Sequence, residues 1–161
     1  MDLRPRAPLR DDQVLVTGDI SHDWVIATGE LHAHAKSPVD VHYRTTRFRE
    51  VHHVQGVLLH ELLARVNLRL DKRHKMDHLS FVVLAHAEDG YRALLSWGEV
   101  DPEFGACAAL LATRYNGVLL TRPTLVIPRD GRASRFVRGV RTLRVARIDL
   151  SGAEPVIPPR A

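Results

Sequence analysis

Two dipeptides that lie between apolar runs, Asp89-Gly90 and Asn116-Gly117, constrain the fold of this chain more than any other feature. Both tolerate the positive backbone φ angles that tight β-hairpin turns require. They separate runs of strand length, namely residues 79–84 from 91–95 and residues 108–113 from 118–120. The sequence therefore predicts two antiparallel hairpins within a sheet.

Hydrophobic periodicity predicts further strands and helices. Apolar side chains recur every three or four residues over 57–66, which predicts an amphipathic helix that begins after Gly56. Ser96 and Glu99 form a capping-box pattern for a short helix over 97–104. Residues 44–54 are polar and predict no regular element. The remaining expected elements are strands at 14–18, 24–27, 39–43, 125–127 and 143–150, and one or two helical turns within 29–36.

These elements show no internal repeat and no regular alternation of strand and helix. The predicted class is therefore α+β, with a mixed, largely antiparallel sheet and a few short helices. A length of 161 residues suits one domain with an ordinary core. We assign residues 1–12 to an N-terminal arm, residues 13–150 to the domain, and the proline-rich residues 151–161 to a C-terminal tail.

Composition excludes several classes of protein. No apolar run approaches the roughly 18 residues of a membrane span, and the N-terminus lacks the apolar stretch of a secretory signal. A cytoplasmic protein without membrane contact is therefore expected. The single cysteine, Cys107, excludes an internal disulfide and any cysteine-rich metal site. Such a residue is typically small and buried; its alternative role is that of a metal thiolate. The ten histidines match no recognised zinc spacing.

Positive charge is concentrated near the end of the chain. Residues 121–150 contain eight arginines but only two aspartates, Asp130 and Asp149. From 129 to 147 an arginine recurs at every third residue, a period that fits neither one strand face nor one helix face. One interpretation is a solvated basic surface. The other is that two or three of these guanidinium groups, with backbone amides after Gly131, converge on phosphate.

Five phrases carry a family resemblance across roughly residues 14–148. They are GVLLHELL from Gly56, Asp89-Gly90-Tyr91, SWGEVDPEF from Ser96, RYNGVLL from Arg114 and LVIPRDGRASRFVRGVRTLRV from Leu125. In this order and at this spacing they resemble the molybdopterin-binding domain of the sulfite oxidase family. The resemblance implies that domain's fold and binding of molybdopterin or the complete molybdenum cofactor.

The resemblance also implies where such a cofactor would lie. Arg135 and Arg138 occupy the positions of basic residues that hold the cofactor phosphate in the family, and Tyr91 lies on a hairpin that the family places near the cofactor. His42 falls near the position where the family has its metal-binding cysteine. The predicted cofactor-binding residues are Arg132, Arg135, Arg138, Asn116, Tyr91 and His42.

The chain departs from the family where the chemistry takes place. The region that should carry the metal-binding cysteine, residues 41–53, contains none. The stretch Thr121-Arg122-Pro123-Thr124 lacks the family's histidine and has threonine in place of its arginine. Imidazole or phenol does not substitute simply for a soft thiolate on molybdenum. We therefore assign no catalytic and no metal-binding residue, and sulfite-type catalysis is not expected.

Three functions are compatible with these observations. The first is a stand-alone domain that binds molybdopterin or a related anionic ligand. The second is a divergent molybdenum-dependent oxidoreductase that works with a separate redox partner protein. The third is nucleic-acid binding through the arginine-rich segment 129–147. That segment offers Phe136 as its single aromatic side chain for stacking, which disfavours single-strand binding.

Overall fold

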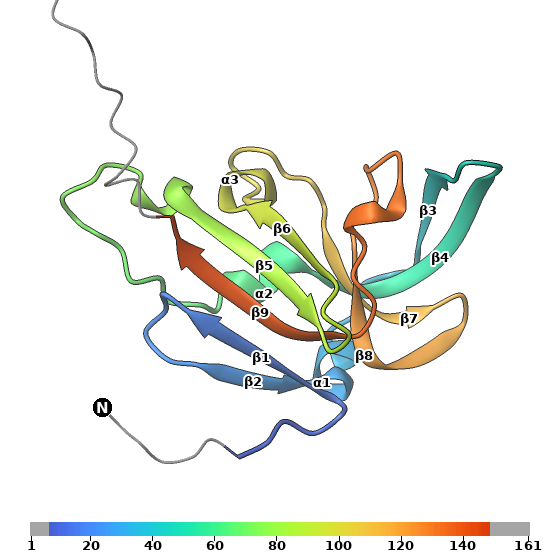
Figure 1. Cartoon of the computed structure of the whole chain (residues 1–161), viewed down its shortest axis with the longest axis horizontal. Coiled ribbons are helices and arrows are strands. Elements are labelled where there is room, and N and C mark those ends of the chain that lie inside the picture. The colour runs from blue at the N-terminus through green and yellow to red at the C-terminus, as the bar shows by residue number, and fades with distance from the viewer. Residues whose placement is uncertain (1–6, 149–161) are drawn as a thin grey trace, which may run out of the picture.

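The structure is a computed structural model that describes residues 7–148, and two β-sheets with a few short helices make up its fold (Figure 1). The strands are β1 (Gln13–Gly18), β2 (Trp24–Ala27), β3 (Val39–Arg44), β4 (Arg49–Leu58), β5 (Phe81–Ala87), β6 (Arg92–Ser96), β7 (Leu110–Tyr115), β8 (Val118–Val126) and β9 (Val140–Arg147). The helices are α1 (Thr28–Ala33), α2 (Leu59–Leu63) and α3 (Trp97–Val100), with 3₁₀ turns η1 (Asp77–Ser80) and η2 (Ala133–Arg135). The predicted α+β class is confirmed, although the strands are divided between two sheets.

The five-stranded sheet has the order β2-β1-β9-β5-β6. β1 pairs in parallel with β9, whereas β1–β2, β5–β9 and β5–β6 are antiparallel pairs. The sheet is therefore mixed, as predicted. The expected strand over 143–150 corresponds to β9, and its last two residues lie outside the described part of the chain.

The four-stranded sheet has the order β3-β4-β7-β8 with antiparallel pairing throughout. Residues 118–120 and 125–127 were expected as separate strands, but β8 runs without a break from Val118 to Val126. Pro123 lies within it and has no N–H to donate. An edge strand tolerates this loss because one of its sides needs no partner.

The predicted helix over 57–66 is wrong at its start. β4 continues to Leu58, and α2 covers only Leu59–Leu63. The reason is the close approach of β7: a Cβ on Gly56 would lie 1.9 Å from the backbone oxygen of Leu111, so the two backbones meet there at a distance only glycine allows. Pairing with β7 then keeps Val57 and Leu58 extended.

No element was predicted for the polar residues 44–54, but residues 49–54 form the outer part of β4 and Arg44 ends β3. The outer half of β4 pairs only with β3, and the two strands project as a hairpin beyond the body of the molecule (Figure 1). The outer half of β4 has little core to bury, so it lacks the apolar alternation that signals a half-buried strand.

The Asn116-Gly117 turn and the Ser96–Glu99 cap are as predicted, whereas the β5–β6 turn has a positive φ at Gly90 and not at Asp89. Asn116 and Gly117 have φ angles of 46° and 81° in the β7–β8 turn, and Gly90 has a φ of 89° in the β5–β6 turn. The Ser96 Oγ accepts a hydrogen bond from the Glu99 amide, and the Glu99 carboxylate accepts one from the Ser96 amide. The helix they cap, α3, ends at Val100 and is shorter than the predicted 97–104.

One hydrophobic core joins the two sheets. It includes Val14, Val83 and Leu143 from the five-stranded sheet, and Leu111 and Leu125 from the four-stranded sheet. Leu125 also pairs through its backbone with Val137, which ties the segment before β9 to β8. Within residues 7–148 no helix has the length and apolar character to cross a membrane.

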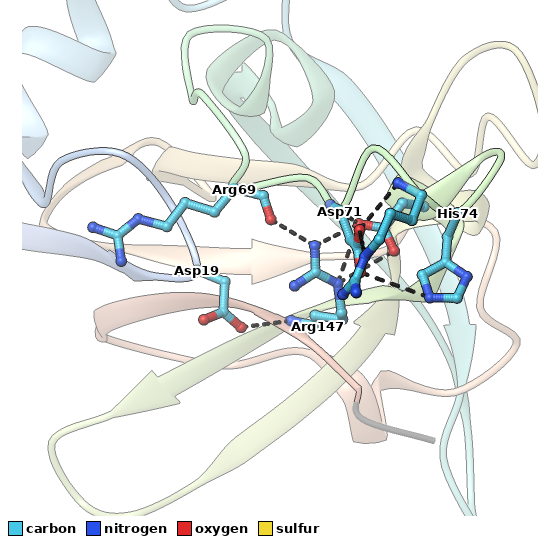
Figure 2. A network of polar contacts seen from close by, with 7 residues as sticks. Asp19, Arg69, Asp71, His74 and Arg147 are labelled. Atoms are coloured by element: carbon cyan, nitrogen blue, oxygen red, sulfur yellow. Dashed lines mark hydrogen bonds and ion pairs between the residues drawn. The ribbon is translucent and has the colours of Figure 1, made fainter. Parts of the chain in front are cut away.

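A polar network fixes the end of β9 to the loop before β5 (Figure 2). The Arg147 guanidinium donates to both oxygens of Asp77 and to the backbone oxygen of Arg69, while the Arg147 amide donates to the Asp19 carboxylate. Asp77 also accepts from the Asp71 amide. The network therefore holds a long connection, residues 64–80, against the sheet.

Candidate functional site

The site centres on an aromatic pocket at the junction of the two sheets. Its volume is about 250 Å³. β3, β7 and β8 supply one wall, the β5–β6 turn supplies the rim, and η2 with the residues after it closes the other side. The lining residues are Tyr43, Asp89, Tyr91, Tyr115, Thr124, Ala133, Phe136 and Arg138. We call this the tyrosine pocket.

Two more open hollows share walls with the tyrosine pocket. The first, of about 480 Å³, shares Tyr43 and is otherwise lined by His42, Arg44, Arg49, Glu50, Val51 and Gly131. The second, of about 450 Å³, shares Asp89 and Arg138 and also contains Asp11, Glu88, Thr121 and Arg122. Both flanking hollows contain arginines, namely Arg44 and Arg49 in the first and Arg122 and Arg138 in the second.

The loop after β8 lies close to the outer hairpin and shapes the pocket. The Arg44 amide donates to the backbone oxygen of Gly131 at 2.8 Å. Phe136 is buried and packs edge-on against Tyr43, with ring centroids 5.6 Å apart. The Tyr91 hydroxyl donates to the backbone oxygen of Ser134, which links the β5–β6 turn to η2. These contacts fix the aromatic walls.

A chain of hydrogen bonds runs along one side of the pocket. The Tyr43 hydroxyl donates to Glu50 Oε2 at 2.9 Å, and His52 Nε2 lies 2.7 Å from the same oxygen. His52 Nδ1 lies 2.5 Å from the Tyr115 hydroxyl. Sequence patterns do not single out Glu50, His52 or Tyr115, because only the sheet register brings them together.

Protonation in this cluster follows from burial and hydrogen bonding. The pKa of Tyr43 is raised to about 12. Burial is the larger cause, and the hydrogen bond to Glu50 is the next. Burial also raises the pKa of Tyr115. Hydrogen bonds from His52 and Tyr43 lower the pKa of Glu50. At neutral pH both phenols are therefore protonated and Glu50 is ionised.

The six predicted cofactor-binding residues do not gather at one point. Tyr91 and Arg138 line the tyrosine pocket, and His42 lines the hollow beside it. Asn116 lies on the β7–β8 turn, where its side-chain oxygen accepts from the His53 amide. Arg132 is exposed immediately before η2.

Arg135 is engaged within the protein. Its guanidinium donates to the Asp130 carboxylate at 2.8 and 2.9 Å and to Glu99 at 2.9 Å. Hydrogen bonds to Asp130 and then to Glu99 raise its pKa well above the usual range for arginine. Its charge is thus balanced by two carboxylates, which fix α3 to the loop that carries η2.

No cluster of three or more histidine, cysteine or acidic side chains suited to a metal ion occurs among residues 7–148. Cys107 is half-buried and packs against the hydrophobic core, and it is not among the residues that line the three hollows described above. The donor set at the tyrosine pocket is therefore phenol, hydroxyl, carboxylate and guanidinium, without the thiolate that a sulfite-oxidase-type molybdenum centre needs.

No family model matches the chain, and no curated protein matches it. Among solved structures, the crystal structure of the sulfane dehydrogenase SoxCD from Paracoccus pantotrophus matches 87% of this chain with a TM-score of 0.63. The fold is of the sulfite oxidase type. Sequence identity is 15%, and the matched region spans 40% of the SoxCD chain, so the likeness concerns the fold alone. The fold expected from the sequence phrases is confirmed, and the cofactor-binding residues remain predictions.

Proposed function

We propose that this domain binds a small anionic ligand with a planar ring in the tyrosine pocket, and that the ligand is molybdopterin or a related phosphorylated pterin. One observation carries the proposal: Arg138 is an exposed guanidinium in the lining of an open pocket that also contains four aromatic side chains, Tyr43, Tyr91, Tyr115 and Phe136. Aromatic walls favour a planar ring, and guanidinium makes bidentate, charge-assisted bonds to phosphate or carboxylate. The sulfite-oxidase-type fold supports the pterin as the ring system.

The residues fit the two ends of the cofactor differently. Arg138 suits a phosphate, and the hollow next to it extends the space toward Arg122. The metal end lacks its usual ligand, because Cys107 is the sole cysteine of the chain and lies off the pocket. The proposal therefore includes no reaction at a metal and no sulfite-type catalysis.

The arginine-rich segment does not present a continuous free basic surface. Arg135 pairs with Asp130 and Glu99, and Arg147 pairs with Asp77. Duplex binding depends on several unpaired cations that contact phosphates, so these two ion pairs reduce the number of arginines that the segment could offer to nucleic acid.

The test is the cofactor content of the protein purified from a host that makes molybdenum cofactor. Elemental analysis measures molybdenum, and fluorescence after acid oxidation measures pterin. The proposal expects pterin without stoichiometric molybdenum. Pterin with equimolar molybdenum would instead favour the divergent oxidoreductase with a redox partner.

A pair of variants links the pterin to this pocket. Arg138→Ala should reduce bound pterin about tenfold or more, because a charge-assisted bond is lost. Arg141→Ala is the matched control: Arg141 is an exposed arginine on β9 and is not among the pocket-lining residues. Equal pterin content in both variants, or none in the wild type, would overturn the proposal.

A further inference from the structure

The cluster beside the tyrosine pocket is ordered by strand register. Tyr43 on β3 lies opposite Glu50 on β4, and Tyr115 on β7 lies opposite Val54 on β4. His52 is two residues from both Glu50 and Val54, so its side chain shares their face of the sheet. Three adjacent strands thus place a carboxylate, an imidazole and two phenols in one row.

Ring packing holds this row in one orientation. The His52 ring contacts Tyr43 and Tyr115 edge-on, with centroids 5.1 and 5.2 Å apart. The His52 side chain is only 16% exposed. Its imidazole is therefore held between the two phenols and has little freedom to turn toward solvent.

The hydrogen bonds give the row a direction. Glu50 is ionised and can only accept, so the nearby Nε2 of His52 carries a proton and donates to it. In neutral His52 the other nitrogen, Nδ1, is then an acceptor, and the Tyr115 hydroxyl donates to it. A carboxylate that orients imidazole, which in turn accepts a proton from a hydroxyl, is the arrangement that activates hydroxyl groups in enzymes.

The two phenols are the members of this row that reach the tyrosine pocket. Tyr115 and Tyr43 line the tyrosine pocket, whereas His52 is not among its lining residues. Arg138 lines the same pocket and is the cation that faces the phenols and Glu50. A bound anion would therefore lie between a guanidinium and a hydroxyl that can pass its proton inward.

We propose that Tyr115, His52 and Glu50 form a proton relay that catalyses keto–enol tautomerisation of small aromatic 2-oxo acids. The inference uses the pocket of the proposed function but a different ligand. Arg138 binds the carboxylate and stabilises negative charge on the adjacent oxygen, and the aromatic walls hold the ring. Tyr115 is the catalytic residue, and His52 and Glu50 are positioning residues that act through it.

The step balances without a co-reactant. Tyr115 Oη takes a proton from the carbon next to the carbonyl while its own proton passes to His52 Nδ1. The electron pair of the broken C–H bond forms the C=C bond, and the carbonyl π pair moves to oxygen. Tyr115 then protonates that oxygen, His52 returns its proton to Tyr115, and the enol leaves. Because the transfers are concerted, no free phenolate forms, which suits the raised pKa of Tyr115.

The test follows exchange of the methylene protons of phenylpyruvate with solvent in D₂O by proton NMR. Phenylpyruvate supplies the ring, the carboxylate and the enolisable carbon. Positioned acid–base groups contribute about 10²-fold or more, so the wild type should accelerate exchange by that order over buffer. Tyr115→Phe should abolish the acceleration and His52→Gln should remove most of it. Buffer-level exchange with wild-type protein, or full activity in either variant, overturns the relay.

His53→Gln is the matched control. His53 follows His52 on β4, points to the opposite face and pairs with Asp40, so its loss should leave exchange unchanged. A fall equal to that of His52→Gln would show a general effect of hairpin damage and overturn the assignment.

Two further measurements separate the relay from a structural role. Nitrogen-15 spectra of neutral His52 should show the proton on Nε2, and a proton on Nδ1 would reverse the relay and overturn it. Glu50→Gln should slow exchange and change the nitrogen-15 spectrum of His52, because a neutral amide no longer requires the proton on Nε2. Slower exchange with an unchanged nitrogen-15 spectrum would remove Glu50 from the relay. If the protein binds pterin but does not accelerate proton exchange of phenylpyruvate, the relay alone is contradicted. If it accelerates exchange but binds no pterin, only the proposed function is contradicted.

Discussion

Arg147 on β9 and Asp77 on η1 form a bidentate ion pair across 70 residues of sequence. Asp77 is buried, and the Arg147 guanidinium also lies over the Phe81 ring, with its carbon 5.0 Å from the ring centroid. The pair closes the polar network that holds residues 64–80 in place (Figure 2).

This pair predicts a dependence of stability on pH. Hydrogen bonds from Arg147 and the Asp71 amide lower the pKa of Asp77 below its ordinary value of 3.8. A carboxyl with a lowered pKa in the folded state stabilises the fold above its unfolded pKa, and this contribution is lost as pH falls through the folded value. Asp77→Asn should therefore lower the melting temperature at neutral pH and flatten its decline below about pH 4.

Thermal melts over this pH range check the prediction. Glu103→Gln, a change at an exposed carboxylate, should leave both the melting temperature and the acid decline as in the wild type. If the melting temperature of Asp77→Asn fell with decreasing pH as steeply as that of the wild type, Asp77 would not be the source of the pH dependence.

Gly56→Ala should destabilise the protein by about 3 kcal/mol, since overpacking forces backbone shifts. The added Cβ would lie 1.9 Å from the Leu111 oxygen and 2.7 Å from the Ala112 Cα. Gly29→Ala is the control, because no atom lies within 4 Å of its added Cβ and alanine favours helix α1. Urea unfolding of both variants measures the difference, and equal midpoints would show that β4 and β7 have room to separate.

Arg135→Ala should reduce stability by about 1 kcal/mol, because its ion pairs are partly exposed and screened. The loss should shrink in high salt. Arg132→Ala, at an exposed arginine three residues earlier, should change stability little. Chemical unfolding at low and high salt makes the comparison. If instead Arg135→Ala leaves stability intact and removes bound pterin, Arg135 serves the ligand and not the link between α3 and η2.

Cys107→Ser should leave pterin binding unchanged and lower stability slightly. Cys107 packs against the core beyond α3, and its amide donates to the Glu99 backbone oxygen. Pterin content and a thermal melt of the same preparation measure both effects. Loss of a bound metal or pterin in this variant would show that the thiol reaches the ligand.

Several elements followed from neighbouring residues alone. The Asn116-Gly117 turn was predicted because both positions need positive φ, and the Ser96–Glu99 capping box because its donors and acceptors lie within one helical turn. The helix predicted to begin at Val57 was misplaced, because leucine spacing does not report the strand that pairs with this segment. β4 was missed because its outer half has little core to bury.

The residues of the candidate site were likewise predicted only in part from the sequence. Tyr91 and Arg138 were predicted from the phrases that resemble a known family, and both line the tyrosine pocket. Glu50, His52 and Tyr115 were not, because His52 and Tyr115 are 63 residues apart and become neighbours only through the β4–β7 register.

The sequence by itself determined the α+β class, the turns, the cap and the basic segment near the end of the chain, because these depend on contacts within a few residues. Tertiary structure decided which arginines form ion pairs, and it placed Tyr43, Glu50, His52 and Tyr115 in a hydrogen-bonded row beside the tyrosine pocket. Pairing between distant strands fixes those positions, and the energy of such pairing depends on the whole sheet and not on the local sequence.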